Sequence, residues 1–223
     1  MTANLLSQET TLAHQPASYP LYGQLINEVQ RLPLPAKQVL QSLYTQFSQG
    51  ITPSVVDYLP IIEDATHALV NIATHSGVIT TCFGCQCASA GSKPTEHVIE
   101  WGSGKVYAWC IWDAFFISQQ VGRAAQISTL DSISQDRIDI FFDGSAFITS
   151  ALWFSFPLAT SDSNEVGLTE SVRACFCCRT KAFTSLEHAK WFASLNHCEV
   201  IDIEEMLART QKMVAALTSP AMS

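Results

Sequence analysis

Cysteine is the residue type whose placement in this sequence most clearly suggests chemistry. The chain has 223 residues and eight cysteines: Cys82, Cys85, Cys87, Cys110, Cys175, Cys177, Cys178 and Cys198. Cys177 and Cys178 are adjacent, and a disulfide between neighbouring residues would close a strained ring. Closely spaced thiols of this kind are more typical of metal binding or redox chemistry than of a disulfide framework.

The first group of chemically useful residues is the segment Tyr-Ala-Trp-Cys-Ile-Trp-Asp at 107–113. If Cys110 opens a helix, Asp113 lies on the same face of its first turn, and the positive end of the helix dipole favours the thiolate. A thiolate beside a carboxyl group combines a soft nucleophile or metal ligand with a proton carrier. The alternative is that Cys110 packs in the core as a small apolar residue and Asp113 only interacts with the helix dipole.

A second group lies in the segment Arg-Ala-Cys-Phe-Cys-Cys at 173–178. The surrounding residues, 172–183, predict a strand, in which Cys175 and Cys177 would point to one face and Cys178 to the other. Three cysteines within four residues could supply metal ligands or a nucleophile. The alternative is that they are thiols buried in a sheet.

The third group is Cys82, Cys85 and Cys87, in a short polar stretch that we expect to be a loop, 82–92. Thiolates at C-x-x-C spacing on a glycine-containing turn can share one soft metal ion. This is half of a zinc site, and the second half would have to come from Cys175, Cys178 or a histidine. The alternative is an ordinary cysteine-bearing loop.

The spacing of apolar residues predicts the elements that must position these groups. Helices are predicted at 21–32, 36–48, 53–59, 61–74, 109–121, 184–195 and 203–217, the sixth of them opened by a capping box, Thr184-Ser185-Leu186-Glu187. Strands are predicted at 77–81, 97–101, 105–108, 124–128, 137–142, 151–157, 172–183 and 199–201. We therefore expect an α+β protein: a helical, winged-helix-like module at 1–80, then a mixed or antiparallel sheet domain with flanking helices at 81–223.

The charge of the chain bears on its partners. It has 12 Lys and Arg against 20 Asp and Glu, a formal net charge of −8, and residues 1–80 hold only Arg31 and Lys37 as basic residues. A recognition helix without cations cannot position itself on phosphates, so we expect no nucleic-acid binding.

The apolar stretch 140–158 alternates like strands around Asp143-Gly144, so we expect no membrane span. The first twenty residues have no secretory signal pattern, which with the unpaired spacing of the thiols predicts a reduced, cytoplasmic protein.

Several of these segments together resemble the organomercurial (alkylmercury) lyase family. The similar motifs cover roughly residues 94–195: Pro-Thr-Glu-His at 94–97, Tyr-Ala-Trp-Cys with the following Asp at 107–113, Val-Gly-Arg-Ala-Ala at 121–125, Arg173 with Phe-Cys-Cys at 176–178, and Phe-Thr-Ser at 183–185 leading to Ala-Lys-Trp at 189–191. The N-terminal helices are similar in kind, because the family carries a winged-helix-like module that does not bind DNA.

The resemblance implies an activity and its residues. Two cysteines and an aspartate of the family cleave a carbon–mercury bond, and by motif these are Cys110, Cys177 and Asp113. It implies an organomercurial substrate, a hydrocarbon product, and Hg²⁺ held by Cys110 and Cys177, with no cofactor required. Cellular thiols or a mercuric reductase would then take up the Hg²⁺.

The sequence also departs from the family pattern. Relatives usually carry a further, structural cysteine in the stretch that here reads Ile127–Asp131 and includes Leu130, and a histidine where Arg179 stands. The Cys82, Cys85 and Cys87 loop and Cys175 are additions. These departures leave two alternatives open: a soft-metal-binding thiol protein, with the metal in that loop, or a relative that acts on a substrate without mercury. Neither reading assigns a role to Cys178 or Cys198.

Overall fold

A long antiparallel sheet forms the base of the molecule. The computed structural model describes residues 20–51, 73–75, 78–80, 84–85, 95–158 and 176–220. Within them the larger sheet has the order β1-β2-β3-β5-β4-β6-β7-β8, and each neighbouring pair is antiparallel. Its strands are β1 (Ala73–His75), β2 (Val78–Thr80), β3 (Gly84–Cys85), β4 (His97–Glu100), β5 (Lys105–Ala108), β6 (Ala125–Leu130), β7 (Arg137–Phe142) and β8 (Phe147–Ile148).

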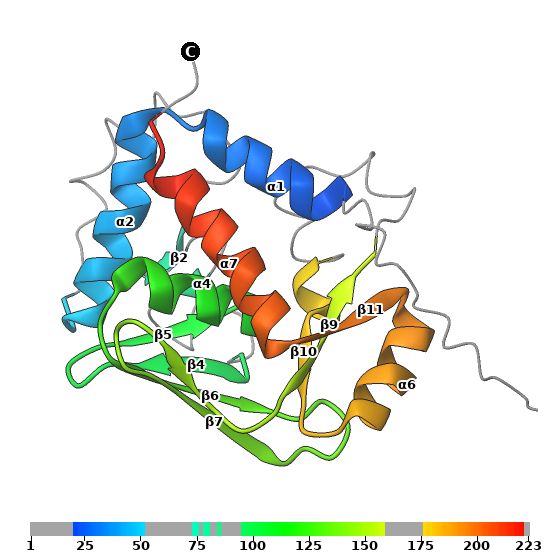
Figure 1. Ribbon diagram of the computed structural model, residues 1–223. Coiled ribbons are helices and arrows are strands. Elements are labelled where there is room, and N and C mark those ends of the chain that lie inside the picture. Colours follow the sequence, from blue (N-terminus) through cyan, green and yellow to red (C-terminus); the bar gives the residue numbers. More distant parts are fainter. Residues whose placement is uncertain are drawn as a thin grey trace, which may run out of the picture.

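Four helices lie on one side of this sheet, and α4 packs directly on it (Figure 1). They are α1 (Pro20–Arg31), α2 (Leu34–Ser48), α4 (Ile111–Val121) and α7 (Ile203–Thr218). Helix α4 is buried along most of its length and contacts β4, β5 and β6 on one side and α2 and α7 on the other. The hydrophobic side chains of all four helices belong to one core, so the N-terminal helices and the C-terminal helix together enclose α4.

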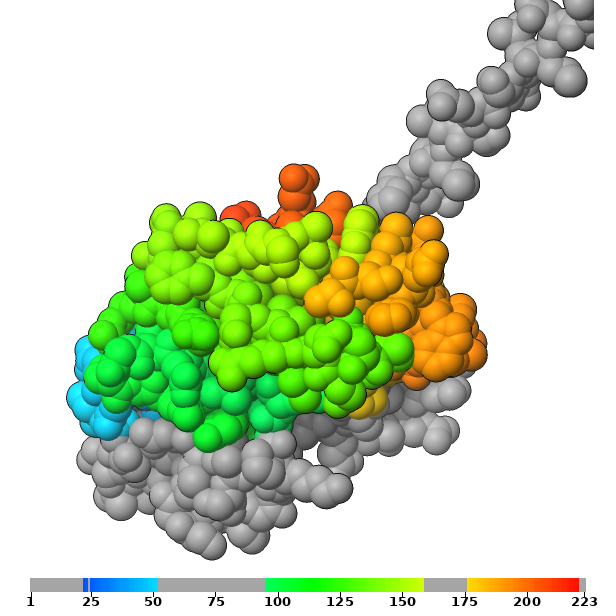
Figure 2. Space-filling view, turned by 90° about the horizontal axis from the view of Figure 1, so that it is seen from below, coloured from blue at the N-terminus to red at the C-terminus, as the bar shows by residue number. Residues whose placement is uncertain are grey.

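A second, three-stranded sheet with the order β10-β9-β11 lies beside the first. Its strands are β9 (Trp153–Pro157), β10 (Lys181–Phe183) and β11 (Cys198–Asp202), and β10 follows a short 3-10 helix, η5 (Cys177–Arg179). Helix α6 (Leu186–Asn196) contacts all three strands of this sheet or their ends, with β9 and β11 foremost. Seen from below, the outer strands of the larger sheet form the surface between α2 and α6 (Figure 2).

A buried lysine ties the N-terminal helices to the end of the chain. Lys37 on α2 is fully buried, and its Nζ donates to the carbonyl oxygens of Gln30, Ala216 and Ser219 at 3.1, 3.0 and 2.9 Å. The last carbonyls of a helix have no partner within it, so a cation placed there satisfies them and matches the helix dipole. Lys37 thereby fixes α1 and α2 against the C-terminal end of α7.

Most predicted elements of the described part are confirmed, which gives the expected α+β class of fold. The helices predicted at 21–32, 36–48, 109–121, 184–195 and 203–217 are α1, α2, α4, α6 and α7, and each of the predicted strands other than 172–183 matches a strand of one of the two sheets. Gly122 ends α4 in the left-handed conformation, with φ 65°, as a glycine there should. The helix predicted at 53–59 and most of that at 61–74 lie outside the described residues, and the two-module division at residue 80 stays a prediction.

Four local predictions are wrong. Ala73 and Thr74, which the prediction assigns to a helix at 61–74, instead belong to strand β1 (Ala73–His75). The loop expected at 82–92 contains β3 at Gly84–Cys85, which pairs with β2 and β5. The strand predicted over 172–183 is described from residue 176 onward, and there Cys177–Arg179 is a 3-10 helix while Lys181–Phe183 is a strand. The N-cap of α6 is Ser185 and not Thr184, whose hydroxyl is used elsewhere.

None of the helices that the structure describes has both the length and the apolar character needed to cross a membrane.

A buried cysteine, aspartate and cysteine site

Cys110 and Asp113 are positioned by the junction between β5 and α4. Cys110 is the N-cap of α4, with an extended backbone at φ −146° and ψ 172°. Asp113 is the third residue of the helix, and its Oδ2 accepts the backbone N–H of Cys110 at 3.2 Å. An acidic side chain at this position reaches back to the N-cap and satisfies a backbone donor that the helix leaves unpaired. Helix initiation alone therefore orients the carboxylate toward the cysteine, as the spacing predicted.

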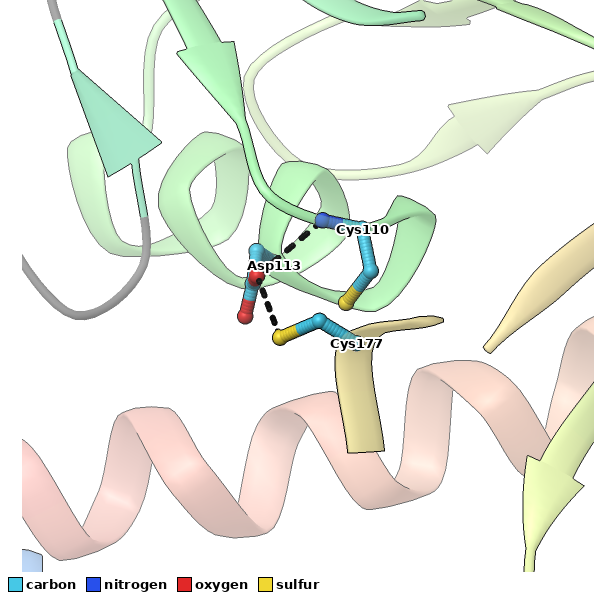
Figure 3. Close-up of side chains that lie close together, drawn as sticks. All are labelled: Cys110, Asp113 and Cys177. Carbon is cyan, nitrogen blue, oxygen red and sulfur yellow. Dashed lines mark hydrogen bonds between the residues drawn. The ribbon is translucent and has the colours of Figure 1, made fainter. Parts of the chain in front are cut away.

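Cys177 comes to the same place from the other end of the fold. It opens η5, and its Sγ donates to Oδ2 of Asp113 at 3.6 Å. The two sulfur atoms and a carboxylate oxygen of Asp113 all lie within 4.8 Å of one another. Figure 3 shows the three side chains converging, Cys110 and Asp113 from the start of α4 and Cys177 from the facing short helix. Among the described residues, this is the one group of three His, Cys, Asp or Glu side chains close enough to hold a metal ion.

The surroundings of the two thiols raise the pKa of each. Cys110 and Asp113 are 0% exposed and Cys177 is 4% exposed. Burial raises the pKa of the Cys110 thiol, and the charge of Asp113 raises it further, although a hydrogen bond with Cys177 opposes this. The hydrogen bond with Cys110, together with burial, raises the pKa of Cys177 well above its ordinary value. The pKa of the Cys110 thiol is thus raised, opposite to the shift that the helix dipole was expected to produce, and the pKa of Cys177 is raised as well.

Four aromatic rings pack together where η5 meets the start of α4. Trp112 precedes Asp113, Phe176 precedes Cys177, and their rings meet edge to face with centroids 5.3 Å apart. Phe156 contacts Phe176 at 5.1 Å, and Tyr22 of α1 contacts Phe156 at 5.5 Å and Trp112 at 5.9 Å. This aromatic box of Tyr22, Trp112, Phe156 and Phe176 packs η5 against the start of α4. Edge-to-face pairs of this kind add about 0.5–1.5 kcal/mol each beyond burial.

A buried histidine lies at the end of the sheet next to Cys110. His97 opens β4 and pairs with Ala108, the last residue of β5. Its Nδ1 is 2.8 Å from the Oγ1 of Thr129, and burial, with the nearby charge of Lys181, lowers its pKa to about 3. The imidazole is therefore neutral at physiological pH. The carboxylate of Glu96 lies 3.5 Å from the Nε2 of His97 and forms an ion pair with Lys181 at 3.1 Å. His97 is inside the family-like motif, but its type alone did not reveal this burial.

Of the other thiols that the structure describes, Cys178 and Cys198 are not part of the site. Cys178 is exposed, and Cys198 is buried, with its Sγ donating to the carbonyl oxygen of Asn196 at 3.3 Å. Burial raises the pKa of Cys198 to about 11. Cys85 lies in β3, while Cys82, Cys87 and Cys175 are outside the described residues. The metal site expected at Cys82, Cys85 and Cys87 thus stays a prediction.

Leu130 and Arg179 stand at positions where the family pattern has another residue, and the structure shows the contacts of both. Leu130 ends β6, where it pairs with Arg137. The Arg179 guanidinium donates to the carbonyl oxygen of Asn196 at 3.3 Å, and its own carbonyl oxygen accepts the hydroxyl of Ser155 at 2.7 Å. Arg179 therefore helps join η5 to β9 and the end of α6.

Two buried thiols and one carboxylate on this α+β scaffold form a group that could hold a soft metal ion, with the carboxylate in contact with a sulfur. The family model of the alkylmercury lyases (MerB) matches residues 91–215, more than half of the chain and all three side chains of the site. The protein belongs to the alkylmercury lyase family.

A solved structure with a similar fold is the crystal structure of the mercury-bound form of MerB2. It has 14% sequence identity to this chain, with a TM-score of 0.64 over 89% of this chain and 97% of that one. The similarity therefore extends beyond the matched residues into the N-terminal helices. No curated protein matches the sequence.

Proposed function

We propose that the protein is an organomercurial lyase that breaks carbon–mercury bonds by protonolysis at Cys110, Asp113 and Cys177. The observation that carries the proposal is the contact of both cysteines with the same carboxylate, at 3.2 Å through the N–H of Cys110 and 3.6 Å through the Sγ of Cys177. Hg²⁺ binds thiolate in preference to nitrogen or oxygen ligands. The similar fold of MerB2, solved in a mercury-bound form, is in keeping with such a ligand.

The protonated thiols supply both protons that the reaction needs. An organomercurial R–Hg–SR′ exchanges its thiolate for the sulfur of Cys110, and the proton of Cys110 leaves with the departing thiolate as R′SH. Cys177 then passes its proton to Asp113, with which it already shares a hydrogen bond, and its sulfur binds the mercury. The raised thiol pKa values hold these protons in place until the substrate arrives.

Asp113 completes the reaction. The second sulfur adds electron density to the mercury and weakens its bond to carbon, so that carbon takes the electron pair and the proton from Asp113 as the bond breaks. The products are the hydrocarbon RH and Hg²⁺ bound by Cys110 and Cys177, and Asp113 returns to the carboxylate. Mercury stays in the +2 state throughout, so the reaction requires no redox cofactor.

The product has to leave by thiol exchange. Two thiols from solution, or the thiols of a mercuric reductase, would replace the two sulfurs on Hg²⁺ and return protons to Cys110 and Cys177. Such an acceptor is abundant where thiols are kept reduced, which agrees with a cytoplasmic location.

Release of benzene from phenylmercury tests this function. Purified protein with excess thiol should produce benzene, measured by gas chromatography, in repeated turnovers, while buffer with the same thiol should not. If benzene formation does not exceed that of the thiol alone, the protein is not a lyase for this class of substrate. Metal analysis of protein purified under reducing conditions separates the alternative, because a stoichiometric resident soft metal would instead indicate a metal-binding thiol protein.

A further inference from the structure

Asp131 is a fully buried carboxylate that the proposed reaction does not use. It follows directly after β6 and has a side-chain exposure of 0%. Its Oδ1 accepts the backbone N–H groups of Ile133 and Ser134 at 2.9 and 3.1 Å. Its Oδ2 accepts the backbone N–H and the hydroxyl of Thr184 at 2.7 and 2.9 Å. A buried charge is costly unless it is fully hydrogen-bonded, and here both oxygens are occupied twice.

The two oxygens serve different parts of the fold. Oδ1 accepts hydrogen bonds from the turn that follows β6 of the larger sheet. Oδ2 accepts hydrogen bonds from Thr184, the residue that follows β10 of the smaller sheet. The backbone continues the connection, because Asp131 forms a parallel bridge with Ala182 and Ser132 donates to the carbonyl oxygen of Ala182 at 3.3 Å. The carboxylate therefore sits on the seam between the two sheets.

This seam connects the strands that carry the two halves of the reactive site. Cys177 is on η5, and η5 leads through Thr180 into β10, so the Asp131 contacts anchor the chain just after Cys177. Cys110 and Asp113 follow β5, which is joined to β6 through β4. On its other edge β10 pairs with β9. Asp131 is thus a buried polar link between the strand after Cys177 and the larger sheet, beside the ion pair of Lys181 with Glu96 at 3.1 Å.

We propose that Asp131 is a positioning residue for Cys177, setting its sulfur against Cys110 and Asp113 by fixing β10 to the end of β6. The proposal rests on the function proposed above for the three site residues. Burial alone would raise the pKa of Asp131, but the hydrogen bonds from Thr184, Ile133 and Ser134 lower it below its ordinary value, so the ionised form makes the link. The imidazole of His188, with its Nδ1 3.7 Å away from Oδ1, faces the same carboxylate from α6.

Mercury retention measures the relative position of the two sulfurs without requiring turnover. Hg²⁺ held by Cys110 and Cys177 together resists removal by a monothiol, because releasing one sulfur leaves the other bound. The probe is mercuric chloride, added at one equivalent and removed with rising 2-mercaptoethanol. The Cys110→Ser/Cys177→Ser double variant gives the mercury held by the other cysteines, and Cys177→Ser gives the value for one sulfur of the site.

Asp131→Ala should release mercury at a 2-mercaptoethanol concentration at least about tenfold lower than wild type, and its kcat for phenylmercury should fall about a hundredfold, the size expected for a misplaced reacting group. KM should change less, because Cys110 still takes up the substrate. Thr184→Val, which removes only the hydroxyl donor, should shift both quantities in the same direction by a smaller factor. Lys37→Met is the matched control: it removes a buried charge far along the chain from the seam, so it should lower the melting temperature and leave mercury retention and kcat unchanged.

If Asp131→Ala does not fold, Asp131→Asn provides a second test of the positioning role. An amide has one acceptor oxygen, so it can keep the turn or the link to Thr184 but not both, and mercury retention should again fall. Wild-type retention in Asp131→Ala or Asp131→Asn, or an equal loss in Lys37→Met, would overturn the proposal. If the wild type retains mercury through both sulfurs and the Asp131 variants do not, yet benzene is never released, the proposed reaction fails while the positioning role stands.

Discussion

The Sγ of Cys177 lies 3.6 Å from Oδ2 of Asp113, although 64 positions of the sequence separate the two residues. The same oxygen accepts the backbone N–H of Cys110. One carboxylate atom is therefore in contact with both cysteine residues, which places the proton donor of the site beside its proton acceptor. This arrangement makes the roles of the three side chains separable by mutation.

Loss of either thiol should abolish turnover. In Cys110→Ser or Cys177→Ser, a hard hydroxyl replaces a sulfur that must bind mercury, so benzene release from phenylmercury should fall about a thousandfold or more. Cys198→Ser is the control, since the Sγ of Cys198 contacts the carbonyl oxygen of Asn196 rather than the site. Retention of a tenth of wild-type activity by either site variant would show that the second sulfur is dispensable.

Asp113→Asn should separate chemistry from binding. The amide oxygen can still accept the N–H of Cys110, so the start of α4 should form normally. The amide cannot carry a proton from Cys177 to carbon, and loss of such a group costs about 10²–10⁴ in kcat. Mercuric ion titration should show unchanged retention. A variant with normal kcat would mean that the proton reaches carbon by another route.

The buried thiols should react slowly with alkylating agents. The raised pKa values of Cys110 and Cys177 leave little thiolate at pH 8, so iodoacetamide should modify the exposed Cys178 before either of them, as measured by mass spectrometry of the peptides. The alkylation rate of Cys198 should keep rising with pH up to about 11, the value that burial gives its pKa. Equal modification of Cys110 and Cys178 at pH 8 would contradict the protonated resting state.

His97 should make the protein less stable in acid. Its pKa is about 3 in the folded protein because burial, and then the charge of Lys181, disfavour the protonated ring, while the ordinary value is 6.5. Between these values the unfolded chain binds the extra proton, so stability falls as the pH decreases from about 6.5 toward about 3. The slope from this one group approaches about 1.4 kcal/mol per pH unit.

Denaturant unfolding of wild type and His97→Gln over this pH range isolates that contribution. Glutamine can hydrogen-bond the hydroxyl of Thr129 but does not titrate, so the variant should lose less stability on acidification than the wild type. Parallel stability curves for the two proteins would exclude the buried, neutral imidazole.

Local sequence determined the parts of this protein that depend on short-range geometry. Cys110 and Asp113 are three residues apart, and a helix that starts at Cys110 must place the carboxylate over its own N-cap, whatever the rest of the fold does. The strands and helices with regular apolar spacing were predictable for the same reason, as was the left-handed glycine at the end of α4. The motif similarity also predicted Cys177 as a residue of the site, which its spacing along the chain could not have done.

Tertiary structure decided what depends on packing between distant segments. The residues after position 175 have the composition of a strand, but Cys177–Arg179 form a 3-10 helix. Phe176 packs in the aromatic box, and the Sγ of Cys177 faces Asp113. The raised pKa of the Cys110 thiol also follows from burial and is opposite in direction to the shift expected from the helix dipole. Asp131 is an ordinary turn residue in the sequence, and only the meeting of two sheets makes it a buried link, because hydrogen bonds across 53 positions cannot be inferred from neighbours along the chain.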